Sequence, residues 1–182
     1  MQPMKYLLNF LDNNAKENHY LFTLKDFRAL FPYLNDNTFK TLLSRTVKAG
    51  YLTRICRNIY IFNKNMPQNG LILYHIAALL RADQFNYISL ENILSEYGII
   101  SQIPINHLSI MSSGRSNIIS CDQFGVIEFI HTNKKPSSIL KQLSYDKQYK
   151  LWRASVKLAF QDMKSTHRNL DLINMEILHE FI

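Results

Sequence analysis

The stretch that most constrains the fold is GYLTRICRNIYIFN, residues 50–63, in which apolar residues alternate around a polar interruption. The interruption centres on Arg57 and Asn58, which a buried strand would not accommodate. Asn tolerates the positive φ that tight hairpin turns require. The stretch therefore predicts a β-hairpin with strands over 52–55 and 59–62, joined at these two residues.

Three helical patterns precede the hairpin, over residues 5–14, 22–32 and 35–50. Thr23 stands three positions before Asp26, which predicts a capping box at the start of the second helix. For the third helix, Asp36 or Asn37 is the expected N-cap and Gly50 the expected stop. Three helices followed by a hairpin within 65 residues is the order of a winged helix-turn-helix domain. In that fold the third helix reads the major groove and the hairpin is the wing.

Charge is distributed unevenly along the 182 residues, whose net charge is +7. Residues 1–65 hold ten Lys/Arg against four Asp/Glu, residues 66–130 two against five, and residues 131–182 nine against five. Basic segments attract nucleic acid, although many are plain solvated surface. With 47% hydrophobic and 19% charged residues, the chain has the composition of a globular protein with a buried core.

A set of polar residues on the third helix and the hairpin forms the predicted DNA-binding surface. Phosphate binding needs cations and small hydroxyls on a convex surface, and base reading needs side chains near the start of the inserted helix. Arg45 has the chemistry to contact guanine in bidentate fashion. The same pattern also fits a solvated helix with a charged hairpin, or a winged helix that binds protein. The predicted surface comprises Thr38, Lys40, Thr41, Ser44, Arg45, Lys48, Arg54, Arg57 and Asn58.

The second half predicts a mixed α/β domain, so the fold class is α+β with domains at 1–65 and 66–182. Its helices are expected at 71–81 and 89–98, and its short β runs at 107–113, 117–121 and 126–132. From Ser138 onward the tail is predicted to be helical, with 144–164 as its clearest piece.

Two stripes follow from the helical interpretation of 144–164. One is an apolar seam expected to dock on the second domain: Tyr145, Tyr149, Trp152, Val156, Ala159 and Met163. The other is a basic stripe, for which a solvated face, an acidic protein partner and nucleic-acid phosphate all remain open. We take this stripe as the candidate partner surface, formed by Lys150, Arg153, Lys157 and Lys164.

No catalytic or metal-binding pattern stands out, and we expect no enzyme activity, no metal and no cofactor. The six histidines show neither HxxxH nor HExxH spacing, and no cysteine neighbours them. SSGRS, residues 112–116, resembles a phosphate-binding loop superficially, but a hairpin turn is the favoured interpretation. Cys56 and Cys121 stand far apart, which favours a reducing cytosol over a disulfide framework. No signal peptide or membrane span is expected, so we predict a cytoplasmic protein.

Three stretches, in this order, are similar to the AbiEi-type antitoxins of bacterial type IV toxin–antitoxin systems. The first is GYLTRICRNIYIF, which resembles the family's helix-to-wing signature, and the second is YISLENILSEYGII from Tyr87. The third is HLSIMSSGRSNIISCDQFGVIEFIHTNKK from His107, which resembles the family's β-rich segment. The resemblance spans roughly residues 35 to 135.

The resemblance implies a winged-helix domain that binds inverted repeats in the promoter of its own operon. It also implies a carboxy-terminal domain that counteracts a nucleotidyltransferase-like toxin of the AbiEii type, with no direct contact required. Many relatives have Gly at the wing turn, where this chain has Asn58. The alternatives are a winged-helix protein–protein adaptor, a plain transcriptional regulator without antitoxin activity and, more distantly, a small nucleotide-dependent enzyme. The DNA role implied by the resemblance falls on Thr41, Ser44, Arg45, Lys48, Arg54 and Arg57.

Overall fold

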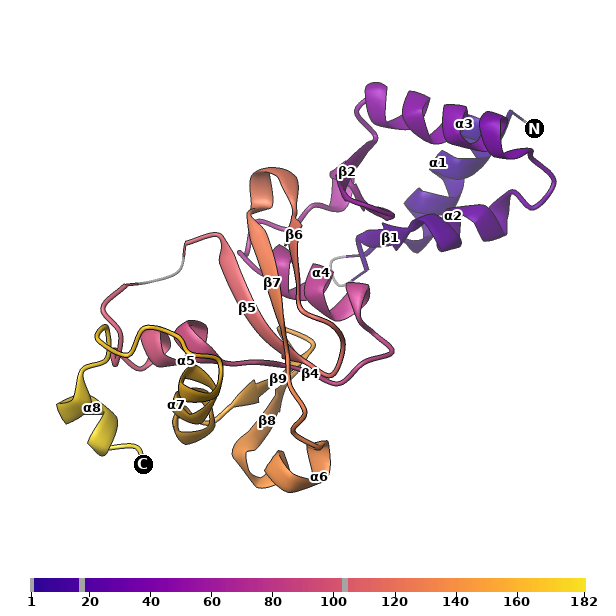
Figure 1. The fold of residues 1–182 in the computed structure, drawn as a ribbon. Helices are drawn as coiled ribbons and strands as arrows, with labels where there is room; N and C mark the ends of the chain where they lie inside the picture. The colour runs from indigo at the N-terminus through magenta and orange to yellow at the C-terminus, as the bar shows by residue number, and fades with distance from the viewer. Residues whose placement is uncertain (1, 17–18, 103–104) are drawn as a thin grey trace. The chain divides into compact units, whose positions relative to one another are not determined.

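The structure, a computed structural model, describes residues 2–16, 19–102 and 105–182. The chain divides into two compact units, 1–70 and 71–182, which we describe separately (Figure 1). Both contain helices and a β-sheet, so the fold is of the α+β class.

The first unit joins three helices to a small antiparallel sheet. In chain order its elements are α1 (Pro3–Asn14), β1 (Leu21–Thr23), α2 (Leu24–Leu30), α3 (Asp36–Lys48), β2 (Leu52–Cys56), β3 (Ile59–Phe62) and η1 (Asn63–Asn65). The sheet order is β1-β3-β2, so β3 lies in the middle. The three predicted helices are present, but the sequence did not predict β1. Three residues are too few for a period-2 pattern, and this strand forms by pairing with β3.

The helix starts show where local sequence is decisive. Thr23 caps α2 as predicted: its Oγ1 accepts from the backbone N–H of Asp26 at 3.2 Å, and the Asp26 carboxylate accepts from the backbone N–H of Thr23 at 2.7 Å. The N-cap predicted for α3 was wrong, because Asn35 fills that position and its side chain accepts from Thr38 N at 2.9 Å. Asp36 instead pairs with Arg28 of α2 at 3.0 Å.

The hairpin forms at the predicted place. Asn58 has a φ of 66°, which confirms that its backbone takes the left-handed conformation at the turn. β3 occupies the predicted residues, and β2 extends one residue further, to Cys56. The pairing register shifts between Arg54 and Cys56, which leaves Ile55 as a bulge that stays buried. Gly50, with a φ of 76°, follows the end of α3 as the predicted stop.

An aromatic cluster forms the core of the first unit. Phe22, Phe27 and Phe31 are at most 1% exposed, and the rings of Phe22 and Phe27 stack at 5.7 Å. α3 contributes Phe39, Leu42 and Leu43 to the same core. Thr46 is buried as well and Val47 packs against this core, so the buried face of α3 is fixed and the opposite arc faces solvent.

The second unit is built on a six-stranded mixed sheet. Its elements are α4 (Ile72–Leu80), β4 (Asn86–Ile88), α5 (Leu90–Glu96), β5 (His107–Ser112), β6 (Asn117–Ser120), η2 (Asp122–Phe124), β7 (Val126–His131), α6 (Pro136–Ile139), η3 (Leu140–Gln142), β8 (Leu143–Asp146), β9 (Leu151–Ala154), α7 (Val156–Ser165) and α8 (Met175–His179). The strand order is β6-β7-β5-β4-β9-β8. β5 pairs with β7, and β4 with β9, in parallel; the other pairs are antiparallel.

Helical segments cover both faces of this sheet (Figure 1). Arg81, which ends α4, lies over the ring of Phe129 at 3.9 Å, whereas Arg168, which follows α7, binds the carboxylate of Glu128. Phe129 and Glu128 are neighbours on β7, and successive side chains of a strand point to opposite faces. The end of α4 and the segment after α7 therefore lie on opposite faces of the sheet.

The predicted tail helix over 144–164 is wrong in its first half, which forms the β8–β9 hairpin. Tyr145 and Trp152 are directly opposite each other in this hairpin, with their rings edge to face at 5.4 Å. A spacing of seven puts two residues on one helical face, but it also suits a cross-strand pair around a short loop. β9 gains further pairing from β4, far away in sequence. The helix begins only at Val156, after the N-cap Ser155.

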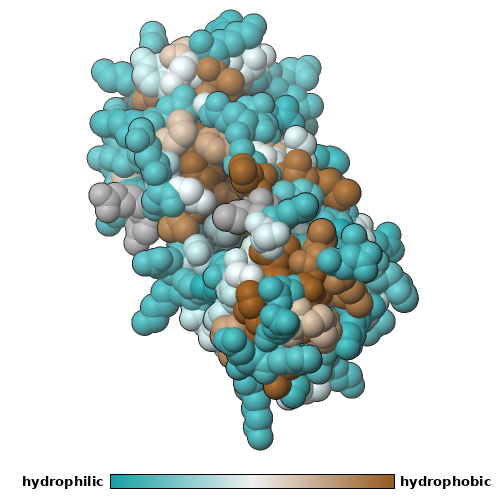
Figure 2. Space-filling model, turned by 90° about the vertical axis from the view of Figure 1, so that its left-hand side faces the viewer, coloured by the Kyte–Doolittle hydropathy of each residue, from teal (hydrophilic) through white to brown (hydrophobic). Residues whose placement is uncertain are grey.

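Exposed apolar side chains occur along the second unit, with Ile105 and Ile118 the most exposed and a further group near the C-terminal segment. Figure 2 shows brown apolar surface among polar side chains on one face of the molecule. The large apolar residues exposed from α5 onward to the C-terminus include Tyr97, Leu170, Leu172, Met175, Phe181 and Ile182. In the described residues, every helix falls short of the length and apolarity that crossing a bilayer demands.

Candidate nucleic-acid interface

The predicted DNA-binding residues all lie on the solvent-exposed surface of the first unit. α3 buries Phe39, Leu42, Leu43 and Thr46, which leaves the opposite arc of the helix in water. The hairpin presents its residues in the same way, with Arg57 and Asn58 at the turn. The nine exposed positions are Thr38, Lys40, Thr41, Ser44, Arg45, Lys48, Arg54, Arg57 and Asn58. We refer to them together as the α3–hairpin surface.

The cations of the α3–hairpin surface have no counter-ion in the part of the chain that the structure describes. Among the described residues, no carboxylate lies within ion-pair distance of Lys40, Arg45, Lys48, Arg54 or Arg57. Exposed guanidinium and ammonium groups without carboxylate partners keep their full capacity to bind anions.

The carboxylates of the first unit that the structure describes are already engaged elsewhere. Asp12 pairs with Lys64 at 2.7 Å, and Asp36 pairs with Arg28 at 3.0 Å. Asp26 accepts from the backbone N–H of Thr23 in the capping box. These carboxylates therefore do not neutralise the cations of the α3–hairpin surface, which stays positively charged.

The hairpin turn is held in a fixed place beside α2. The backbone N–H of Leu24, the first residue of α2, donates to the carbonyl of Asn58 at 2.9 Å. Thr23 pairs with Ile59 across the β1–β3 ladder. Because the turn is tied to the start of α2, the Arg57 side chain projects from a defined backbone.

The hydroxyls of α3 differ in what they can offer a ligand. Thr41 Oγ1 donates to the carbonyl of Asn37 at 2.8 Å, so its hydrogen is already used and only its oxygen can accept. The hydroxyl of Ser44 makes no hydrogen bond among the described residues, so it can donate to a phosphate. The Ser44 hydroxyl can therefore donate to an external anion, whereas Thr41 Oγ1 can only accept.

The predicted basic stripe of the tail is not the face of one helix, because its residues lie on two different elements. Lys150 lies in the β8–β9 turn with a φ of 57°, and Arg153 lies on β9. Arg153 is paired with Glu96, and with Asp146 at 3.3 Å. Its charge is therefore balanced by carboxylates of its own unit. Lys157 and Lys164 are exposed on α7, two turns apart. The physical reason is the hairpin, which places half of the predicted stripe on a different element.

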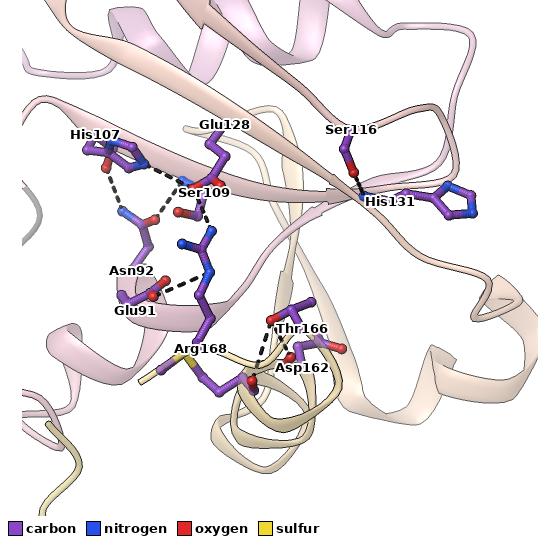
Figure 3. A network of polar contacts seen from close by, with 11 residues as sticks. Glu91, Asn92, His107, Ser109, Ser116, Glu128, His131, Asp162, Thr166 and Arg168 are labelled. Carbon is purple, nitrogen blue, oxygen red and sulfur yellow. Dashed lines mark hydrogen bonds and ion pairs between the residues drawn. The ribbon is translucent and has the colours of Figure 1, made fainter. Parts of the chain in front are cut away.

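The second unit also contains a polar network that the sequence did not predict (Figure 3). Glu128 on β7 accepts from Arg168 at 2.5 Å and lies 3.2 Å from His107 Nε2 on β5. Arg168 also approaches Glu91 of α5, with its Nε 3.6 Å from Oε1. Burial raises the pKa of Glu128, but the hydrogen bonds from Arg168 and His107 outweigh it, and the net pKa is lowered. The network ties the segment after α7 to α5, β5 and β7.

A buried carboxylate joins α7 to the strands. Asp162 is 0% exposed, and it accepts from Ser89 Oγ at 2.6 Å and from the ammonium of Lys134. Burial and the charge of Asp162 raise the pKa of Tyr87 above its usual range. Sequence reasoning missed both polar networks, because the residues that pair in them stand 21 to 77 positions apart and no local pattern marks them.

Metal-ligating side chains do not gather anywhere in the described residues: no three His, Cys, Asp or Glu are grouped as ligands. The candidate site is the α3–hairpin surface, whose exposed cations and hydroxyls are chemically suited to anions. No protein-family model matches the sequence, and no curated protein matches it significantly.

Proposed function

We propose that the first unit is a winged helix that binds duplex DNA, with α3 as the major-groove reader and the β2–β3 hairpin as the wing. The element order α1-β1-α2-α3-β2-β3 and the sheet order β1-β3-β2 support the fold. The observation that carries the function is the set of five exposed cations on α3 and the hairpin that have no carboxylate partner among the described residues. Phosphates supply counter-ions for these groups, and Arg45 has the chemistry to contact a base.

We further propose that the protein is a type IV antitoxin that represses its own operon and counteracts a nucleotidyltransferase-like toxin. This proposal rests on the similarity of residues 50–62, 87–100 and 107–135 to the AbiEi-type antitoxins. The operator would be an inverted repeat upstream of its own reading frame. An assay of growth rescue, with the neighbouring reading frame induced in the presence or absence of this protein, tests the antitoxin role separately from DNA binding.

The DNA-binding proposal predicts that replacing Arg45, Arg54 and Arg57 together by Ala weakens operator binding. Each lost phosphate contact lowers the slope of log K against log salt by about 0.9. If Arg45 contacts guanine, its loss alone costs about 1–3 kcal/mol of discrimination at one base pair. Gel shifts with the upstream fragment at several salt concentrations measure both quantities.

The matched control removes three exposed lysines of the second unit, Lys135, Lys141 and Lys147, which lowers the net charge equally. We expect this variant to bind the operator with nearly unchanged affinity and salt slope. If the two triple variants bind alike, the α3–hairpin surface does not contact DNA. The adaptor alternative then gains support.

A further inference from the structure

A second anion-binding feature lies in the second unit, at the carboxyl ends of the parallel strands β5 and β7. Ser112 ends β5 and His131 ends β7, and the loop 113–116 passes beside them. Ligands of open α/β sheets commonly bind outside the carboxyl ends of parallel strands. A cavity of about 630 Å³ opens here, within the range of small-molecule sites. Its lining residues are Arg81, Gln84, Ser113, Gly114, Arg115, Ser116 and His131. We call it the Arg81 cavity.

Arg81 provides a partly buried positive charge in this cavity. Its guanidinium donates to Ser112 Oγ at 2.7 Å and to the carbonyl of Arg115 at 2.5 Å, and it lies over the Phe129 ring. Within the described part of the chain, no carboxylate is within ion-pair distance of it. Burial lowers the pKa of Arg81, while the more distant charge of Asp83 opposes this effect. A partly buried charge without a counter-ion is costly, so an anion in the cavity would stabilise it.

The loop is shaped to approach Arg81 closely. A Cβ on Gly114 would lie 1.9 Å from Gln84 Oε1 and 2.9 Å from Arg81 Nη1, so a larger residue here requires the ends of these two side chains to move. The backbone N–H of Gly114 donates to Ser112 Oγ at 3.1 Å. The glycine of SSGRS therefore lets the loop lie close to the Arg81 and Gln84 side chains.

Several further donors line the Arg81 cavity. Ser113 Oγ accepts from Phe85 N at 3.1 Å, and Ser116 Oγ accepts from His131 N at 2.9 Å, a bond visible in Figure 3. Both hydroxyl hydrogens remain available to a ligand. The Arg115 side chain is exposed and has no hydrogen-bond or ion-pair partner among the described residues. The lining contains no carboxylate.

We propose that the Arg81 cavity binds a phosphate group, held by Arg81 and Arg115 with the hydroxyls of Ser113 and Ser116. Two guanidinium groups and two hydroxyls match the charge and the acceptor oxygens of phosphate. The cavity volume leaves room for a nucleotide around that group. The phosphate belongs either to a free nucleotide or to a nucleic-acid strand. The site is in the second unit and does not depend on DNA binding by the first.

Calorimetric titrations of the full chain carrying Arg45→Ala, Arg54→Ala and Arg57→Ala test this site without the α3–hairpin surface. The probes are inorganic phosphate, a nucleoside 5′-monophosphate and a short single-stranded oligonucleotide, each at physiological salt. We expect saturable one-site binding of at least one probe. Adding Arg115→Gln weakens it about tenfold or more, since it removes a charge-assisted contact. Adding Lys141→Gln, which removes an equal charge elsewhere on the unit, leaves it unchanged.

Gly114→Ala provides a second variant. Its methyl group displaces the Arg81 and Gln84 side chains, so we expect it to weaken binding of the phosphate probe. Unchanged melting of the Arg115→Gln variant shows that its effect is not unfolding. Binding of the monophosphate assigns a free nucleotide as the source; binding of the oligonucleotide alone assigns a strand phosphate. The proposal is overturned if no probe saturates, or if Arg115→Gln and Lys141→Gln behave alike.

Discussion

The exposed arginines of the α3–hairpin surface differ from the paired cations that lie inside the second unit. In the first unit, Arg45, Arg54 and Arg57 are exposed and have no carboxylate within ion-pair distance among the described residues. In the second unit, Lys134 and Arg168 pair with carboxylates of distant segments. Paired cations hold a unit together, whereas unpaired cations remain available to an external anion. Other cations of the second unit are also unpaired in the part of the chain that the structure describes, among them Arg81 and Arg115 of the Arg81 cavity and the exposed Lys141.

This difference limits what net charge indicates. Residues 131–182 carry nearly as many Lys/Arg as residues 1–65. Yet Arg153 of the tail is held by Glu96 and Asp146 within its own unit. A segment's net charge is therefore a weak guide to a binding surface until the pairing of each cation is known.

The largest effect is expected for Asp162→Ala, which leaves Lys134 and Ser89 without their buried acceptor. Breaking a buried ion pair by removing one partner costs about 3 kcal/mol or more of unfolding free energy. Urea unfolding followed by fluorescence measures this, because Trp152 is the single tryptophan and lies in the second unit. The exposed Asp171→Ala is the matched control. A loss below about 1 kcal/mol would show that this pair does not stabilise the unit.

A smaller, pH-dependent effect is expected for Glu128→Gln. The folded pKa of Glu128 is below its usual value of 4.5, so its stabilisation is present above that pH and is lost as the pH falls. At pH 7 the variant loses about 1.5 kcal/mol through its weakened bonds to Arg168 and His107. The same fluorescence assay, run from neutral to acidic pH, should show the unfolding free energies of the two proteins becoming equal in acid.

The control for this pH series is Glu180→Gln, at an exposed position near the C-terminus. We expect it to follow the native protein at every pH. If the difference in unfolding free energy between the native protein and Glu128→Gln stays constant down to acidic pH, the role given to the Glu128 carboxylate is contradicted.

The smallest stability effect is expected for the triple replacement of Arg45, Arg54 and Arg57 by Ala. Exposed residues without partners usually change stability by no more than about 0.5 kcal/mol. Thermal unfolding followed by far-ultraviolet circular dichroism measures this, since the first unit contains three helices. A loss above about 1 kcal/mol would show that these cations are structural, which would remove the contrast between the units.

Much of the first unit could be predicted from the sequence because its signals are local. The capping box of Thr23 and Asp26 and the turn at Asn58 each depend on residues fewer than five positions apart. The exposed arc of α3 follows from its helical period and is confirmed by the burial of Phe39 and Leu42. The strand β1 and the N-cap Asn35 were missed, since a three-residue strand and a choice among adjacent cap residues lack a distinctive pattern.

The second unit was harder to predict because its decisive contacts are distant. Residues 144–154 carry a helical spacing, but pairing of β9 with β4 and of Tyr145 with Trp152 makes them a hairpin. The strand β4 was also missed; its three residues pair with β5 on one side and β9 on the other.

The sequence by itself determined the three helices of the first unit, the β2–β3 hairpin and the side-chain chemistry of the α3–hairpin surface, because each depends on local spacing and side-chain type. The tertiary structure decided which cations are paired, the hairpin of the tail and the Arg81 cavity. Each of these brings together residues that stand far apart in the chain, so its energy comes from contacts that only the folded sheet creates.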